Sequence, residues 1–326
     1  MLSARHSVSA RRLLAVTTVV LAGLAPAGAV ATAAPVPPAV ASTSDSREAV
    51  PAPPGLVPGE VPRAACGSPL DDAEVRRLAE LTAPDATPAA TVLEQYERRV
   101  ARSRAADDLL AAHGDRRGVF GVGLDEVSTS AVLPLQRPGV APDPEWARRL
   151  SLDLLDRYLA ALHGHFTGTG VEPHWERFLS LALDCRQRPT FVAMTGYNAH
   201  LTVDLARAVA ASGSRPELLG GYLQIVGAIA DHAPELVERT RRDYGADIGP
   251  LFHFYVVGDV ADAAAGSAGG SPALLRFADQ AYSSLTYAHG LALRDPALHG
   301  AAEGQVLGLW TDADVALQSV TALGGL

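Results

Sequence analysis

Signals that start and stop α-helices recur along most of this 326-residue chain. Asp143, Pro144 and Glu145 form a typical helix start: the aspartate caps free N–H groups, the proline takes the first turn and the glutamate faces the positive end of the helix dipole. Gly114 and Gly213 follow predicted helices, where the left-handed backbone of a helix end favours glycine. No run alternates clearly between apolar and polar residues, as half-buried strands do. The sequence therefore predicts an all-α fold.

Apolar spacing shows which side of a predicted helix faces the core. One such set, spaced four apart, is Trp146, Leu150, Leu154, Tyr158 and Leu162. The same signals predict helices over residues 71–81, 89–112, 144–162, 173–184, 191–211, 215–244 (divided at Pro234), 247–265, 272–294 and 311–323. Residues 118–135 are ambiguous between a short strand and a helix start loosened by glycines. We expect a single large bundle of about eight to ten helices.

Three segments of different composition divide the chain. Residues 1–34 have the pattern of a cleaved signal peptide. Residues 35–65 are rich in proline and alanine and indicate a disordered linker. Residues 66–326 are long enough to bury one large core, and we assign them to the helical domain.

The N-terminal pattern predicts export. Basic residues precede an apolar run over 13–24, and small residues at Ala31, Ala33 and Ala34 offer cleavage sites. The run is shorter than the roughly 20 residues that a transmembrane helix needs. We therefore expect a secreted or extracellular protein with no stable membrane insertion after cleavage.

The charged residues exclude one class of partner. Lysine is absent, so all 27 basic residues are arginine, against 36 acidic residues. Cleavage of residues 1–34 removes three arginines and no acid, which leaves 24 arginines and a net charge of −12 with histidine neutral. A surface this acidic repels phosphate backbones, so we expect no nucleic-acid partner. A small-molecule ligand is compatible with this charge, and the oligomeric state is not predicted.

The chain has two cysteines, Cys66 and Cys185. In an exported protein two cysteines most simply pair, and we predict a disulfide between them. Two buried thiols are the alternative. The bridge would tie the start of the helical domain to the end of the predicted helix 173–184.

The best candidate site is a short polar set in an otherwise apolar predicted helix. Asn198 is the only asparagine of the chain, and it lies two residues before His200, which lies four before Asp204. Residues four apart share a face of an α-helix, so His200 and Asp204 should lie within reach of each other or of one ion. A buried carboxylate is costly unless it is paired, and His200 is the nearest candidate partner. Asn198 projects from a different side and is expected to bind a neighbouring backbone.

Three interpretations of this set stay open. The first is a polar pair in the core, in which His200 donates to Asp204. The second is a divalent metal site, such as zinc, in which His200 and Asp204 are joined by His253 or by other candidates, namely Asp231, His232 and Asp259. The third is a catalytic acid–base pair, in which Asp204 orients His200 for proton transfer next to Asn198.

A second histidine pair, His163 and His165, is the weaker candidate for a metal site. It ends a predicted helix, and alternate residues share a face only in a strand. We therefore expect a capping or surface role for these two residues.

Residues 196–205 also carry a resemblance. They read G-Y-N-A-H-L-T-V-D-L, which is similar to the G-M-N-A-H-I-N-x-D-L motif of the domain of unknown function 5995 family. A looser similarity covers about residues 118–295. The resemblance implies a helical domain and points to Asn198, His200 and Asp204, and it implies no reaction.

The chain departs from that family at three positions. Thr202 stands where the motif has a second asparagine, and Ala206 stands where a proline follows. The aspartate that members carry near Gly221 is missing. If that aspartate belongs to a family site, the site of this chain is incomplete or rearranged.

Two functional hypotheses follow. In the first, the protein is an exported enzyme, a hydrolase or lyase acting on a small or lipid-like molecule at Asn198, His200 and Asp204. In the second, it is a non-catalytic secreted binding or structural domain, and the same residues form a polar network in the core. A pocket open to solvent at His200 would favour the enzyme, and a sealed cluster would favour the non-catalytic domain.

Overall fold

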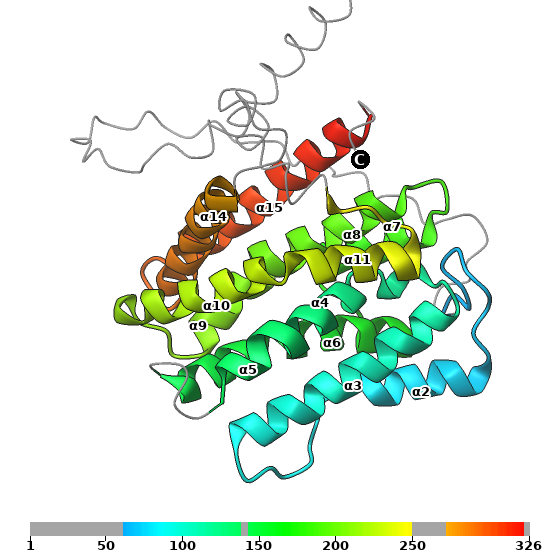
Figure 1. Ribbon diagram of the computed structural model, residues 1–326, viewed down its shortest axis with the longest axis horizontal. Helices are drawn as coiled ribbons and strands as arrows, with labels where there is room; N and C mark the ends of the chain where they lie inside the picture. The colour runs from blue at the N-terminus through cyan, green and yellow to red at the C-terminus, as the bar shows by residue number, and fades with distance from the viewer. Residues whose placement is uncertain (1–60, 138–142, 250–271, 323–326) are drawn as a thin grey trace, which may run out of the picture. The chain divides into compact units, whose positions relative to one another are not determined.

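The computed structural model describes residues 61–137, 143–249 and 272–322, and all regular structure within these ranges is helical. No residue in them belongs to a strand (Figure 1). When segments that continue directly into one another are counted together, these residues form ten helices. The predicted all-α bundle is therefore confirmed, and the ambiguous stretch contains no strand, since residues 121–135 are helical.

The helices follow one another in two halves of the described chain. The first half comprises α2 (Asp72–Thr82), α3 (Val92–Ala112), the 3₁₀ turn η1 (Arg116–Gly118), α4 (Gly121–Val127), η2 (Ser128–Val132), α5 (Leu133–Leu135), α6 (Pro144–Thr167) and α7 (Pro173–Leu183). The second half comprises α8 (Pro189–Asn198), η3 (Ala199–Asp204), α9 (Leu205–Ala211), the 3₁₀ turn η4 (Pro216–Leu218), α10 (Leu219–Asp231), α11 (Ala233–Tyr244), α14 (Pro272–Leu293) and α15 (His299–Ala322).

Local capping explains several helix starts. The Asp143 side chain accepts a hydrogen bond from the backbone N–H of Trp146, as the sequence predicts for α6. This helix continues past Leu162 and ends at Gly168, whose φ of 68° is left-handed. Asp71 and Glu74 form a reciprocal capping box at the start of α2.

The predicted start of the last helix is wrong. This helix begins at His299 rather than at residue 311. The predicted helix 247–265 lies almost wholly outside the described residues.

Two of the continuous helices contain a π-helical turn: η2 lies between α4 and α5, and η3 lies between α8 and α9. In η3, the backbone N–H of Leu205 bonds to the carbonyl of His200, five residues earlier, and η2 has the same pattern between Leu133 and Ser128. Such turns are rare in proteins overall, and those that occur often lie at functional sites. The π turn η3 packs against α6, α7, α14 and α15, so it lies inside the bundle.

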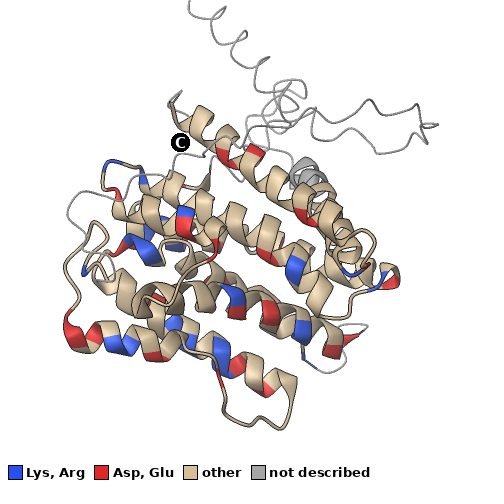
Figure 2. Ribbon diagram, turned by 180° about the vertical axis from the view of Figure 1, so that it is seen from behind, with Lys and Arg blue, Asp and Glu red and all other residues tan. Residues whose placement is uncertain are grey.

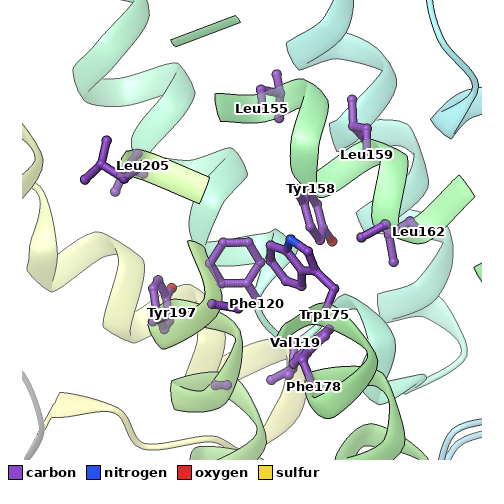
Figure 3. Packing of buried hydrophobic residues seen from close by; sticks show 14 of the residues in the cluster. Val119, Phe120, Leu155, Tyr158, Leu159, Leu162, Trp175, Phe178, Tyr197 and Leu205 are labelled. Atoms are coloured by element: carbon purple, nitrogen blue, oxygen red, sulfur yellow. The ribbon is translucent and has the colours of Figure 1, made fainter. Parts of the chain in front are cut away.

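One aromatic cluster forms the centre of the core (Figure 3). The Phe120 ring lies within 5.0–6.4 Å, centroid to centroid, of the rings of Tyr158, Trp175, Phe178 and Tyr197. These side chains come from α6, α7 and α8 and from the residue that precedes α4. The cluster joins elements from both halves of the chain into one core.

The N-terminal end of the described chain is fastened to the helices. Cys66 and Cys185 form the predicted disulfide, with Cα atoms 5.3 Å apart. The buried side chain of Asp115 accepts a hydrogen bond from the backbone N–H of Ala65, and Arg117 donates to the carbonyl of Pro62. Contacts with the bundle therefore begin within the segment that composition assigns to the linker.

Two surface properties bear on partners. Acidic and basic residues are interspersed over the helices, without a uniformly basic face in the described residues (Figure 2). No helix among these residues combines the length and the apolar character needed to cross a membrane.

Candidate functional site

Asp204, at the end of η3, is bound by two side chains from the first turn of α7. Nε2 of His174 lies 2.9 Å from Oδ1 of Asp204, and Nε1 of Trp175 donates to Oδ2 over 2.8 Å. The Asp204 side chain is only 2% exposed. Both carboxylate oxygens therefore have an N–H partner from a neighbouring helix.

The surrounding imidazoles keep Asp204 ionised. Burial alone would raise the pKa of this carboxyl, but the imidazoles of His174 and His200 more than offset burial and hold its pKa below the usual value. An ionised carboxylate only accepts hydrogen bonds, so Nε2 of His174 carries the proton of the shared bond. The other ring nitrogen of His174 lies 3.8 Å from Oε2 of Glu172.

His200 is close to Asp204 but does not hydrogen-bond to it. Its Nδ1 lies 3.7 Å from Oδ2 of Asp204, which is beyond hydrogen-bond length. The π turn accounts for this spacing, because residues four apart no longer stack directly when the backbone bonds span five residues. His200 and Asp204 are both buried and close together, and the hydrogen bond of the first interpretation is absent.

His200 lies among aromatic rings. Its ring centroid is 5.1 Å from that of Phe120 and 6.3 Å from that of Trp175, and its side chain is 4% exposed. Among the described residues, its Nδ1 is buried without a hydrogen-bond partner. A buried polar atom of this kind calls for an explanation, such as a bound water, an ion or a catalytic role.

Asn198 ties a neighbouring backbone, as expected. Its amide nitrogen donates to the carbonyl of Trp310 on α15 over 2.9 Å. Its amide oxygen accepts from the hydroxyl of Thr202 over 2.9 Å, and Thr202 also contacts the hydroxyl of Tyr282 on α14. Thr202 therefore extends the polar link from Asn198 to α14.

Two of the other metal-ligand candidates, Asp231 and His232, are described and form no metal-binding group with Asp204. Within the described ranges, no group of three or more His, Cys, Asp or Glu residues is placed to hold a metal ion. His253 and Asp259 lie outside the described residues. His232 follows Asp231 at the end of α10, and its Nδ1 donates to the carbonyl of Ala228.

His163 and His165 have separate structural partners. Nδ1 of His163 donates to the carbonyl of Ala79. His165 accepts from Arg117, and burial together with the charge of Arg117 lowers its pKa to about 4. The two side chains therefore serve different contacts and do not form a joint site.

Sequence analysis missed the two residues that hold Asp204. His174 and Trp175 entered that analysis only as members of the predicted helix 173–184. A usable signal exists, because a buried carboxylate needs N–H donors and the dipeptide His174-Trp175 offers two of them at a helix start. Pairing it with Asp204 requires the fold, since 30 residues separate His174 from Asp204.

Comparison with known proteins identifies the family. The model of the family described as "Family of unknown function (DUF5995)" matches residues 91–265, more than half of the 326 residues, so the chain belongs to this family. The chain matches no curated protein and no solved structure.

Proposed function

We propose that this chain is an exported, non-catalytic binding or structural domain, in which Asp204 joins the π turn η3 to α7. The observation that supports this proposal is the complete engagement of the Asp204 carboxylate by His174 and Trp175. All three side chains are buried. A carboxylate that is held on both oxygens and enclosed by aromatic rings is suited to fixing the packing of helices.

A second candidate is an exported hydrolase or lyase that acts on a small or lipid-like molecule. It is favoured by one observation, namely the buried Nδ1 of His200 that lacks a hydrogen-bond partner 3.7 Å from Asp204. Two atoms at that separation can bind one divalent ion such as zinc, and His253 would then be a further ligand. Without a metal, His200 would act as the proton-transfer group and Asn198 would lie near the substrate.

Metal analysis and thermal melts separate the two candidates. The variants are His200→Ala and, as a matched control from another part of the core, His163→Ala. The non-catalytic role predicts no stoichiometric metal in the purified wild type and a melting temperature that a chelator leaves unchanged. A metal that is present in the wild type and in His163→Ala, but lost in His200→Ala, would overturn it.

An activity screen tests the same proposal without reference to metal. Chromogenic carboxylic esters, phosphomonoesters and phosphodiesters are offered to the wild type and to both variants. We expect no turnover above the level of His200→Ala. Turnover by the wild type and by His163→Ala that His200→Ala lacks would establish the enzyme.

Export is tested separately. Mass spectrometry of protein recovered from culture medium should show an N-terminus after Ala31, Ala33 or Ala34. An intact Met1 terminus on cell-associated protein would contradict export.

A further inference from the structure

A second buried aspartate, Asp107 on α3, has a different set of partners. Its side chain is fully buried. The hydroxyl of Tyr158 donates to Oδ1 over 2.8 Å, and the hydroxyl of Ser103 donates to Oδ2 over 3.2 Å. Among the described residues, Asp107 therefore receives its hydrogen bonds from uncharged groups.

The backbone of α4 presses against this carboxyl group. A methyl group built on Gly121 would lie 1.9 Å from Oδ1 of Asp107 and 2.2 Å from the Tyr158 hydroxyl. Contacts this short leave no space for a side chain at residue 121. The carboxyl group and the Tyr158 hydroxyl are thus packed directly onto the helix backbone, with no room for a water molecule between them.

The two nearby arginines, Arg104 and Arg239, form ion pairs with Asp125 and not with Asp107. Nε of Arg104 lies 3.0 Å from Asp125, and NH1 of Arg239 lies 2.8 Å from the same carboxyl group. The ionisable groups that act on Asp107 from the neighbouring helices are Asp125 on α4, Tyr158 on α6, and Arg239 and Tyr244 on α11. No arginine of the described residues therefore contacts Asp107, and a negative charge on it would face the charge of Asp125.

We propose that Asp107 is a pH-responsive element of the fold, which is held as a neutral carboxylic acid between Tyr158 and Ser103 and which destabilises the packing of α3, α4 and α6 when it ionises. The geometry supports this on three counts: complete burial, neutral donors and the diversion of both arginines to Asp125. Burial raises the pKa of Asp107 well above its usual value, and the hydrogen bond from Tyr158 only partly offsets it.

The direction of the pH effect follows from linkage. In the unfolded chain Asp107 ionises near its ordinary pKa of about 4, whereas in the folded chain it keeps its proton to higher pH. Between these two values the folded state binds more protons than the unfolded state. The contribution of Asp107 to stability is therefore present in acid and is lost as the pH rises from about 4 to the folded-state pKa.

The decisive experiment compares Asp107→Asn with the wild-type chain from pH 4 to pH 9. Asparagine has the shape of a protonated aspartic acid, can keep both contacts and cannot ionise. The melting temperature of the variant minus that of the wild type should rise steadily with pH, by several degrees in total. A difference that stays flat, or that falls as the pH rises, overturns the proposal.

Asp204→Asn provides the matched control, because Asp204 is equally buried but ionised. Its melting temperature relative to the wild type should be lowest near neutral pH and should recover only in strong acid. The same rising difference for Asp204→Asn as for Asp107→Asn would show a general effect of removing charge and would overturn the proposal.

Infrared spectroscopy gives a readout that does not depend on the stability of Asp107→Asn. Wild-type protein labelled with ¹³C-aspartate should show the C=O stretch of a protonated carboxyl group at pH 6, where a carboxyl group with the ordinary pKa of about 4 is ionised. Tyr158→Phe, which removes one hydrogen bond to that group, should shift the band to higher frequency. Absence of the band at pH 6, or a band that Tyr158→Phe leaves in place, overturns the assignment to Asp107.

Discussion

Asp204 and Asp107, two of the buried aspartates, are each bound by one ring of a tilted aromatic pair. Trp175 donates to Asp204 and Tyr158 donates to Asp107, and the two rings lie 5.4 Å apart between centroids. Both carboxyl groups are almost fully buried. Yet the pKa of Asp204 lies below its usual value and the pKa of Asp107 lies well above it.

The difference shows that burial does not by itself decide the charge of a carboxyl group. Burial raises the pKa in both places, and the partners decide the outcome. Asp204 has the imidazoles of His174 and His200 beside it, which can carry a positive charge. In the described part of the chain, the hydrogen bonds to Asp107 come from hydroxyl groups alone, so Asp107 keeps its proton to higher pH.

Removing the charge of Asp204 should have the largest effect. In Asp204→Asn the amide offers one acceptor to the two N–H groups of His174 and Trp175, so that one of them is left buried and unpaired. We expect a loss of about 3–5 kcal/mol in the free energy of unfolding, as for other broken buried ion pairs. Urea unfolding at pH 7 measures it, and a loss below about 1 kcal/mol would mean that Asp204 is not the tie between η3 and α7.

The pH dependence of this loss sharpens the comparison. A carboxyl group with a lowered folded-state pKa contributes stability above its unfolded pKa and loses that contribution as the pH falls through the folded-state value. The cost of Asp204→Asn should therefore shrink below about pH 4. The cost of Asp107→Asn should instead be greatest in acid.

The two histidines of the Asp204 cluster should differ in effect. His174→Ala removes a hydrogen bond to a buried charge and should cost about 2–4 kcal/mol. His200→Ala removes ring packing and a longer, 3.7 Å contact with the same charge, and should cost roughly half as much. Paired urea unfolding curves at pH 7 give the ranking. An equal or larger loss for His200→Ala would show that the 3.7 Å contact between His200 and Asp204 stabilises the Asp204 carboxylate at least as much as the His174 hydrogen bond does.

Local signals explain what sequence analysis predicted correctly. The helix start at Asp143 depends on a side chain and an N–H group three residues apart, and the burial of His200 and Asp204 follows from their apolar neighbours. Each of these features depends on residues that are close together in the sequence. They were enough for the fold class and the location of the polar set, whereas the disulfide was predicted from the count of two cysteines.

The features that sequence analysis missed depend on distant contacts or on weak helix formers. The π turn η3 is wider than the assumed α-helix, and the partners of its Asp204 come from α7. The start of α15 at His299 was missed because Gly300, Gly304 and Gly308 lower the helix propensity of that stretch. Packing against α14 compensates for this low propensity.

A methyl group on Gly121 tests the Asp107 side of the comparison. Gly121→Ala places a Cβ atom within 2.2 Å of both Asp107 and Tyr158, and we expect a loss of about 1–3 kcal/mol from overpacking. Gly227→Ala, on α10 and with no atom within 4 Å of its added methyl group, is the control and should raise stability slightly. Thermal melts of both variants decide it. Equal effects of the two substitutions would show that the tight contact at Gly121 relaxes without cost.

The smallest effect should come from Tyr158→Phe, which removes one hydrogen bond and leaves the ring in place. A hydrogen bond between neutral groups contributes about 0.5–1.5 kcal/mol, whereas one to a charged group contributes about 1.5–3 kcal/mol. Because Asp107 is neutral, we expect the lower value at pH 5, measured by urea unfolding. The loss should increase at higher pH only where Asp107 begins to ionise, since the Tyr158 hydroxyl then binds a charge. A loss already in the higher range at pH 5 would show that Asp107 is ionised like Asp204, and the contrast between the two buried acids would no longer hold.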